Sequence, residues 1–186
     1  HPQRLLNAYE NGIFPWYIDE YNYIHWFSPQ KRMIIKPEEM KVSKSLKKSV
    51  LNKGFVIKSN ENFEAVMRNC SNIKRKHEDS TWISEEFIQA YTDLHHLDIA
   101  FSIECYLDEE LVGGLYGLLI GDVFCGESMF AKVTDASKVA FYHLCQQAEK
   151  NGIKLIDCQV YNDHLASLGA YEITREDYFK ILKESF

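Results

Sequence analysis

The first half of the chain alternates short apolar patterns with irregular breaks. Apolar residues recur at helical spacing over residues 2–11, and Gly12 ends that segment. The stretch from 12 to 29 is rich in aromatic residues, and Pro15 and Pro29 disfavour a helix there. The pattern that follows predicts strands over 32–35 and 55–59 and helices over 43–51, 62–70 and 84–97.

The second half changes to strand-like patterning. Turn residues separate three apolar segments, which predict an antiparallel meander over 100–107, 111–120 and 123–130. An amphipathic pattern predicts a helix over 135–150, and Gly152 is its natural stop. The apolar run 154–160 predicts a buried strand parallel to a meander strand, followed by helices over 163–168 and 174–183.

This order of elements predicts an α+β fold in which an acetyltransferase-type (GNAT-like) domain occupies residues 61–186. A meander, a helix, a parallel strand, a short helix and a further strand follow one another in such enzymes. The segment 162–171 resembles their Asn-x-x-Ala…Leu…Gly-Phe sequence. We expect residues 1–60 to form a smaller, basic N-terminal α/β domain. One fold hosts many chemistries, so the architecture alone does not give the substrate.

The composition is that of an ordinary globular protein, but its charge is distributed unevenly. Of 186 residues 46% are hydrophobic, and no apolar run approaches the ~20 residues that span a bilayer. The net charge of −6 argues weakly against nucleic-acid binding. However, segment 31–58 holds nine basic and two acidic residues, whereas segment 98–130 holds seven acidic residues and no Lys or Arg. One half could face phosphates and the other a cationic substrate, or both could be ordinary solvated surfaces.

The five cysteines predict buried, reduced thiols in a cytoplasmic protein. They are odd in number and lack CxxC spacing, which disfavours disulfides and structural zinc. His164 and Cys158 suggest a Cys–His nucleophile, but Cys158 alternates with its neighbours along the strand and should face away from them. We expect no metal, because no cysteine lies at metal-ligand spacing from His77, His95 or His96.

The segment before the helix at 135 bears on the acyl donor. CoA-dependent enzymes of this fold hold pyrophosphate on a Gln/Arg-x-x-Gly-x-Gly/Ala loop, where backbone N–H groups and the helix dipole bind the anion. Here the junction reads Met129-Phe-Ala-Lys-Val-Thr-Asp-Ala-Ser-Lys138, which contains no glycine, and Asp135 would repel phosphate. The acyl group is therefore expected on another carrier, and the basic segment suggests RNA.

Seven short motifs follow one another along the chain, and their order and spacing together are specific enough to indicate a protein family. They are Gly12-Ile-Phe-Pro-Trp-Tyr17, Trp26-Phe-Ser-Pro29, Thr81-Trp-Ile83, Leu111-Val-Gly-Gly-Leu-Tyr-Gly117, Phe124-Cys-Gly-Glu-Ser-Met-Phe130, Leu155-Ile-Asp-Cys-Gln-Val160 and Asn162-Asp-His-Leu-Ala-Ser-Leu-Gly-Ala170. Over essentially its whole length the chain resembles the leucyl/phenylalanyl-tRNA–protein transferases. Members of that family usually begin some tens of residues earlier and carry a further C-terminal tail.

The resemblance implies transfer of Leu or Phe from aminoacyl-tRNA to proteins that begin with Arg or Lys, which marks them for N-end-rule degradation. This reaction is aminolysis of an ester that is already activated, so it needs neither ATP nor a metal, and we expect no cofactor. We also expect a monomer without membrane contact. Two alternatives are a CoA-dependent N-acyltransferase and a noncatalytic protein that binds N-terminal Arg or Lys peptides through acidic residues.

Asp157 and Gln159 stand two residues apart on the predicted strand, so both should project from the same face. A carboxylate in an apolar strand is costly unless it has partners, so Asp157 is either functional or a cap for neighbouring backbone. The resemblance implies that Asp157 takes up or relays a proton and that Gln159 bridges to the substrate amine. We expect Glu127 to orient the aminoacyl end or the amine, or to be a hydrogen-bond partner in the core.

The resemblance also implies which residues bind the donor, although each set could instead serve packing. Stacking on the 3′-terminal adenosine, which contributes ~1–3 kcal/mol per base, is expected from Tyr9, Trp16 and Trp82. Contacts with the tRNA backbone are expected from one short helix that carries Lys44, Lys47 and Lys48. The pocket for the Leu or Phe side chain, or else plain core, is expected from Leu115, Phe124, Met129, Phe141, Leu144 and Ile156.

Overall fold

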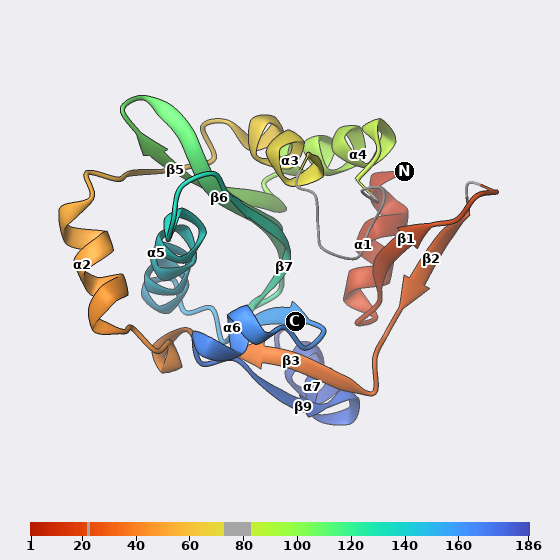
Figure 1. The fold of residues 1–186 in the computed structure, drawn as a ribbon. Coiled ribbons are helices and arrows are strands. Elements are labelled where there is room, and N and C mark those ends of the chain that lie inside the picture. The colour runs from red at the N-terminus through yellow and green to blue at the C-terminus, as the bar shows by residue number, and fades with distance from the viewer. Residues whose placement is uncertain (22, 73–82) are drawn as a thin grey trace.

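A seven-stranded sheet runs through the centre of the molecule (Figure 1). The computed structural model describes residues 1–21, 23–72 and 83–186. All neighbouring strands are antiparallel except β7 and β8, which are parallel as predicted. Across the sheet the order is β4 (Val56–Ser59), β5 (Ala100–Leu107), β6 (Glu110–Ile120), β7 (Val123–Ala131), β8 (Leu155–Gln159), β3 (Lys31–Ile35) and β9 (Tyr171–Thr174).

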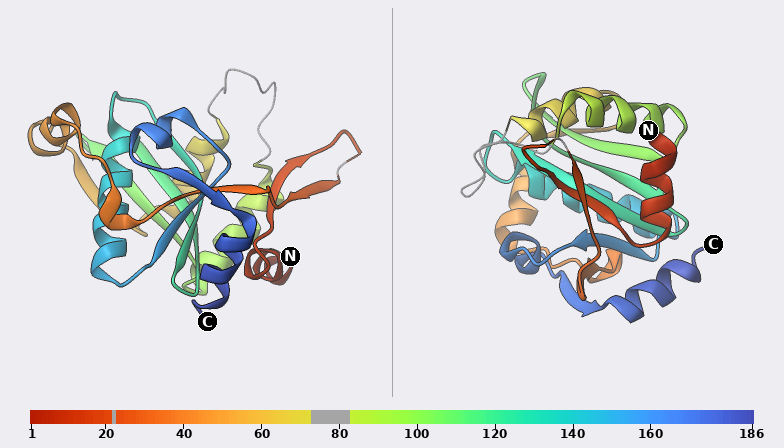
Figure 2. Two further views of the ribbon diagram at one scale, coloured as in Figure 1. Left: turned by 90° about the horizontal axis from the view of Figure 1, so that it is seen from below. Right: turned by 90° about the vertical axis from the view of Figure 1, so that its right-hand side faces the viewer.

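Helices pack on both faces of this sheet, as the views in Figure 2 show. One face is covered by α1 (Pro2–Glu10), α3 (Phe63–Ser71), α4 (Glu85–His96) and α7 (Arg175–Lys183). The other face is covered by α5 (Ala136–Lys150), together with α2 (Lys44–Asn52), α6 (Asp163–Ser167) and the 3-10 turn η1 (Pro37–Glu39). Each layer encloses its own apolar core, because alternate residues of the central strands point to opposite faces.

The predicted helices and strands are present within one residue of their expected bounds. Side-chain caps account for several helix starts: Ser43 Oγ accepts from the Leu46 amide, and Thr174 Oγ1 accepts from the Asp177 amide. The further strand expected after the short helix is β9, at the edge of the sheet. The meander β5–β6–β7, followed by α5 and the parallel strand β8, confirms the α+β fold class.

The aromatic stretch forms a separate two-stranded hairpin of β1 (Phe14–Ile18) and β2 (Ile24–Phe27). The prolines exclude a helix, as predicted, but the stretch is regular rather than irregular. Its register shifts between Pro15 and Tyr17, a bulge that accommodates the missing proline N–H. The rings of Phe14, Trp16 and Phe27 pack on one another. The hairpin and α2 lie at opposite ends of the molecule (Figures 1 and 2).

Residues on both sides of the boundary expected at residue 60 contribute to the main sheet. Strand β4 pairs with β5, and β3 lies between β8 and β9. The division into a basic domain, 1–60, and a catalytic domain, 61–186, stays a prediction about how the chain is organised. Within the described ranges, no helix combines the length and the apolar character that crossing a bilayer requires.

Candidate active site

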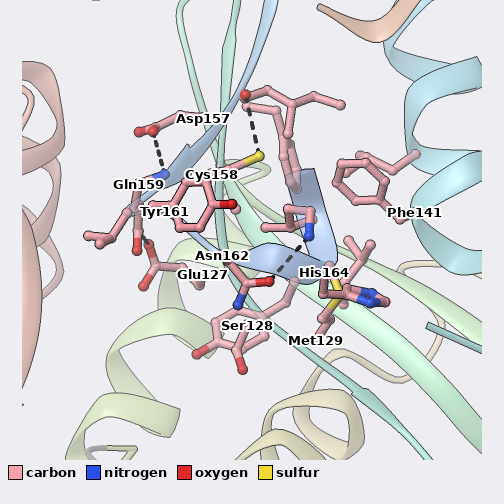
Figure 3. A pocket seen from close by; sticks show the side chains of 18 of the residues that line it. Glu127, Ser128, Met129, Phe141, Asp157, Cys158, Gln159, Tyr161, Asn162 and His164 are labelled. Atoms are coloured by element: carbon pink, nitrogen blue, oxygen red, sulfur yellow. Dashed lines mark hydrogen bonds between the residues drawn. The ribbon is translucent and has the colours of Figure 1, made fainter. Parts of the chain in front are cut away.

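The candidate site lies where β7 and β8 separate. Their parallel pairing ends at Cys125 and Asp157, and the residues beyond this point on both strands line a cavity of about 410 Å³. Each strand also contains a bulge there, since Glu127 has no partner in the β6 register and Cys158 has none in the β3 register. Bulges redirect side chains and are frequent beside active sites. The cavity therefore owes its position to a local break in the sheet. Figure 3 shows side chains that line it.

The apolar part of the cavity faces α5. All six residues predicted to form the pocket for the Leu or Phe side chain line it: Leu115, Phe124, Met129, Phe141, Leu144 and Ile156. Five of them are buried and Met129 is partly exposed. They come from β6, β7, α5 and β8 and belong to the α5-side core. The structure thus brings together an apolar set that is spread over 42 positions of the sequence.

Glu127 is the polar centre of the opposite wall. Its Oε1 accepts from Gln159 Nε2 at 2.6 Å, and its Oε2 accepts from the Tyr91 hydroxyl at 3.1 Å. Burial raises the pKa of Glu127 to about 8, and the nearby Asp157 charge adds to this, although hydroxyl and amide donors favour the ionised form. A carboxyl group with this pKa exchanges a proton near neutral pH.

Tyr9 and Tyr91 continue the network from Glu127 into the core. Their hydroxyls lie 2.6 Å apart, and burial raises the pKa of both, so that both stay protonated. Tyr9 is only 1% exposed and does not line the cavity. Because its ring is enclosed, the stacking on a terminal adenosine that the resemblance implies has no free ring face here. Tyr91 was not among the predicted site residues, because its position in an amphipathic helix is typical of an ordinary core residue.

Asp157 is fully buried, and partners surround its carboxylate. Arg32 donates Nε to Oδ1 at 2.8 Å and Nη2 to Oδ2 at 2.6 Å. The Tyr178 hydroxyl donates to Oδ2 at 2.9 Å, and the backbone N–H of Gln159 donates to Oδ1 at 2.9 Å. The expectation that this buried carboxylate has partners is therefore correct. Arg32 and Tyr178 were missed as site residues, because nothing local marks contacts with Asp157 over 125 and 21 positions.

Gln159 turns out of the strand at this point. Its φ is +65°, a left-handed conformation that is uncommon for glutamine and recurs at functional sites. Asp157 and Gln159 both contact groups on the α1–α4–α7 side, whereas Cys158 packs against the α5-side core. The alternation predicted from the sequence is thus retained. The turn at Gln159 directs its side-chain amide toward Glu127.

Of the three residues predicted to meet the terminal adenosine, the structure describes two, and only one of these two lines the cavity. Trp16 lines the cavity and is 42% exposed, although its ring also packs against those of Phe14 and Phe27. Tyr9 is enclosed, and Trp82 lies outside the described residues. Lys44, Lys47 and Lys48 are all exposed on α2, on the far side of α5 from the hairpin (Figure 1).

The thiols near the site are unsuited to nucleophilic attack. Burial raises the pKa of Cys158 and Cys125 well above the usual value, so both are protonated at neutral pH. Cys158 Sγ contacts the Ile156 carbonyl oxygen at 3.9 Å. His164 lines the same cavity, and burial lowers its pKa. A Cys–His pair that works through a thiolate is therefore disfavoured.

The start of α5 is occupied by a carboxylate of the chain itself. Asp135 precedes this helix with a φ of +73°. Its Oδ2 accepts from Ser49 Oγ at 2.7 Å and from Lys53 Nζ at 3.2 Å, and these contacts lower its pKa. An anionic group already stands where CoA-dependent enzymes bind pyrophosphate, so the geometry argues against a phosphate site there.

Family models match nearly the whole chain. The model described as leucyl/phenylalanyl-tRNA protein transferase matches residues 34–183, and the N-terminal domain model of the same name matches residues 1–30. The chain belongs to the leucyl/phenylalanyl-tRNA–protein transferase family. It is therefore an aminoacyltransferase, as the seven motifs predict. The N-terminal model ends at residue 30, in the loop that leads from the hairpin to β3, and the other model begins at residue 34, within β3.

Individual relatives agree with this assignment. The leucyl/phenylalanyl-tRNA–protein transferase of Flavobacterium johnsoniae is 51% identical over 98% of this chain and 85% of its own length. The transferase of the same name from Nitrosospira multiformis is 50% identical, with 98% and 78% covered. Among solved structures, FemX matches with a TM-score of 0.59 and 12% identity, over 96% of this chain and 70% of its own. FemX shows likeness of fold alone.

Proposed function

We propose that this family member transfers Leu or Phe from aminoacyl-tRNA to proteins whose N-terminal residue is Arg or Lys, in the cytoplasm, and thereby marks them for N-end-rule degradation. One observation carries the proposal: an apolar cavity of about 410 Å³ opens beside the hydrogen-bonded pair of Glu127 and Gln159. The apolar wall suits a Leu or Phe side chain. The names of the relatives supply the donor.

Chemically, the reaction needs an unprotonated amine held against an ester carbonyl. The amine nitrogen forms a bond to the carbonyl carbon, and the bond from that carbon to the ribose oxygen breaks. The amine loses one proton, and the ribose hydroxyl that leaves gains one. The donor ester is already activated, so the protein contributes mainly position and proton transfer.

Glu127 suits the proton transfer better than Asp157. With a pKa raised to about 8, its carboxylate binds a proton strongly enough to take it from an amine near neutral pH. It borders the cavity, and the hydroxyl of Tyr91 and the amide of Gln159 fix both its oxygens. Asp157 is committed to Arg32 and Tyr178. In this division of roles Gln159 holds Glu127 and meets the substrate amine, while Asp157 supports Gln159.

The donor would extend from the cavity across the surface. Trp16 borders the cavity and its side chain is exposed in part, which suits stacking on the terminal adenosine. The lysines of α2 suit contacts with tRNA phosphates farther out, which recognise shape rather than sequence. Such a mode fits an enzyme that must accept several tRNAs carrying the same amino acid.

The test mixes this chain with radiolabelled Leu-tRNA and a model protein that begins with Arg. We expect label that survives ribonuclease and stays with the protein. A matched protein that begins with Ser, and the Arg protein with an acetylated N-terminus, should stay unlabelled. Transfer that ignores these controls would contradict the acceptor assignment, and no transfer to any acceptor would contradict the reaction.

The same experiment separates the two alternatives. A CoA-dependent acyltransferase predicts tight acetyl-CoA binding in calorimetry, which the carboxylate of Asp135 at the start of α5 opposes. A noncatalytic binder predicts that the Arg peptide binds but is never modified. The buried Glu127 network would then have no task, because peptide binding needs no carboxyl group that exchanges a proton near neutral pH.

A further inference from the structure

Arg32 is a buried arginine that neither the motifs nor the proposed reaction employs. Only 1% of its surface is exposed, and its guanidinium carbon lies 4.6 Å from the ring centre of Phe14 and 4.4 Å from that of Tyr178. Two nitrogens donate to Asp157, and Nη1 donates to the Gly12 carbonyl oxygen at 3.0 Å. A buried ion pair is weak evidence for stability, since apolar side chains of similar size stabilise as well. Another role for Arg32 is therefore worth seeking.

The contacts of Arg32 lead step by step to the proposed reaction centre. Asp157 Oδ1, which accepts from Arg32 Nε at 2.8 Å, also accepts from the backbone amide of Gln159 at 2.9 Å. That amide belongs to the residue with a φ of +65°. From there the Gln159 side chain reaches Glu127 at 2.6 Å. Four residues from three strands thus form one continuous chain of hydrogen bonds beside the cavity.

The bond to Gly12 ties a second wall of the cavity to the same guanidinium. Gly12 follows α1 and leads directly into β1, the strand that brings Trp16 to the cavity. Gly12 has a φ of +67°, and a side chain there would collide with Phe179 of α7. The carbonyl that Arg32 holds therefore lies in a turn that strongly favours glycine. One side chain fixes both the Gln159 wall and the start of the hairpin.

We infer that Arg32 is a positioning residue for aminoacyl transfer. It orients the Asp157 carboxylate, which holds the backbone of Gln159 in its left-handed conformation and so directs the Gln159 amide toward Glu127. This inference rests on the proposed function, because it assigns Gln159 and Glu127 to the reacting groups. A strained backbone persists only where its surroundings fix it, and the bidentate ion pair supplies that fixation.

The test is Arg32→Lys, which keeps the charge but cannot make the paired contact with Asp157 or reach Gly12 in the same geometry. We expect kcat for transfer to fall between about tenfold and a hundredfold, the loss that small misplacements cause. The KM for the acceptor and the Kd for aminoacyl-tRNA should stay within about twofold. Arg175→Lys is the matched control, because Arg175 also donates to a backbone carbonyl, that of Ser28, but lies outside the chain of contacts.

A second set of variants distinguishes positioning from general destabilisation. If Arg32 acts through Gln159, the kcat of Arg32→Lys combined with Gln159→Ala should equal that of Gln159→Ala alone. Losses that multiply would overturn the inference, as would an equal loss of kcat in the Arg175→Lys control. If Arg32→Lys fails to fold at the assay temperature, Tyr178→Phe removes one bond to Asp157 and keeps the charges. It should lower kcat in the same direction, and unchanged kcat would overturn the inference.

Failure of the proposed function can be told apart from failure of this inference. If the unmodified chain transfers no amino acid, the proposed function fails. The geometry can still be followed by NMR through the backbone and side-chain amide signals of Gln159. Arg32→Lys should shift both signals and Arg175→Lys neither. Signals that stay in place in Arg32→Lys would overturn the positioning role, whatever the reaction is.

Discussion

Glu127→Gln should remove a pH dependence from the stability of the fold. The pKa of Glu127 is raised from 4.5 to about 8 in the folded chain, chiefly by burial. Between these two values the folded state keeps a proton that the unfolded state has lost. Stability is therefore lost as pH rises through this window, by about 1.36 kcal/mol per pH unit near its middle. Over the whole window the loss amounts to about 5 kcal/mol.

The assay is urea unfolding at several pH values between 5 and 9. The difference in unfolding free energy between the parent and Glu127→Gln isolates the one carboxyl group, because the other titrating groups are common to both. We expect the unfolding free energy of Glu127→Gln to increase relative to that of the parent as pH rises, and the difference to become constant above pH 8. The matched control is Glu149→Gln at the exposed end of α5. The difference in unfolding free energy between this variant and the parent should not follow the trend of Glu127→Gln over the same pH range. Parallel curves for the parent and Glu127→Gln would refute the burial of a protonated carboxyl group.

Three further changes test the walls and the surface of the site. Leu144→Ala should raise transfer of Trp relative to Leu, because Leu144 lines both the main cavity and a second cavity of about 250 Å³, so its truncation enlarges the pocket. Competition between Trp-tRNA and Leu-tRNA measures the ratio. Asp157→Asn should lower the transfer rate and destabilise the fold by roughly 3–5 kcal/mol, since it leaves a buried arginine unpaired, while tRNA affinity measured by filter binding stays within about twofold. Replacing Lys44, Lys47 and Lys48 with Ala should weaken the salt dependence of tRNA binding. The slope of the logarithm of the binding constant against the logarithm of the salt concentration should become shallower by up to about 0.9 per lost phosphate contact.

Each of these three predictions has an outcome that contradicts it. An unchanged Trp-to-Leu ratio would mean that Leu144 does not limit the depth of the pocket. If Asp157→Asn weakens tRNA binding as much as it slows transfer, the residue supports the donor site and not the reaction centre. An unchanged salt slope in the triple lysine variant would place the tRNA on another surface.

Local patterns in the sequence determined the secondary structure, and the family resemblance supplied the apolar wall of the site. Helical and alternating periodicity depends on neighbours within a few positions, so the bounds of α5 and β8 could be predicted within one residue. The missing glycine loop and the charge of Asp135 lie in one short segment, and in the structure the Asp135 carboxylate stands at the start of α5, which argues against a phosphate site there. Gln159 and Glu127 were named from a strand pattern and a family resemblance, and they do meet.

Only the tertiary structure decided what the polar residues do. The order of the sheet places β3 against β8 and so brings Arg32 to Asp157 across 125 positions. It also encloses Tyr9 within the core, although the family resemblance implied a ring that stacks on the terminal adenosine. Charge pairing and burial act through space, and a pKa depends on everything packed around the group. For that reason the sequence could predict the Asp157 strand, whereas only the fold showed that its carboxylate pairs with Arg32. The proposal that Glu127 transfers the proton rests on that pairing.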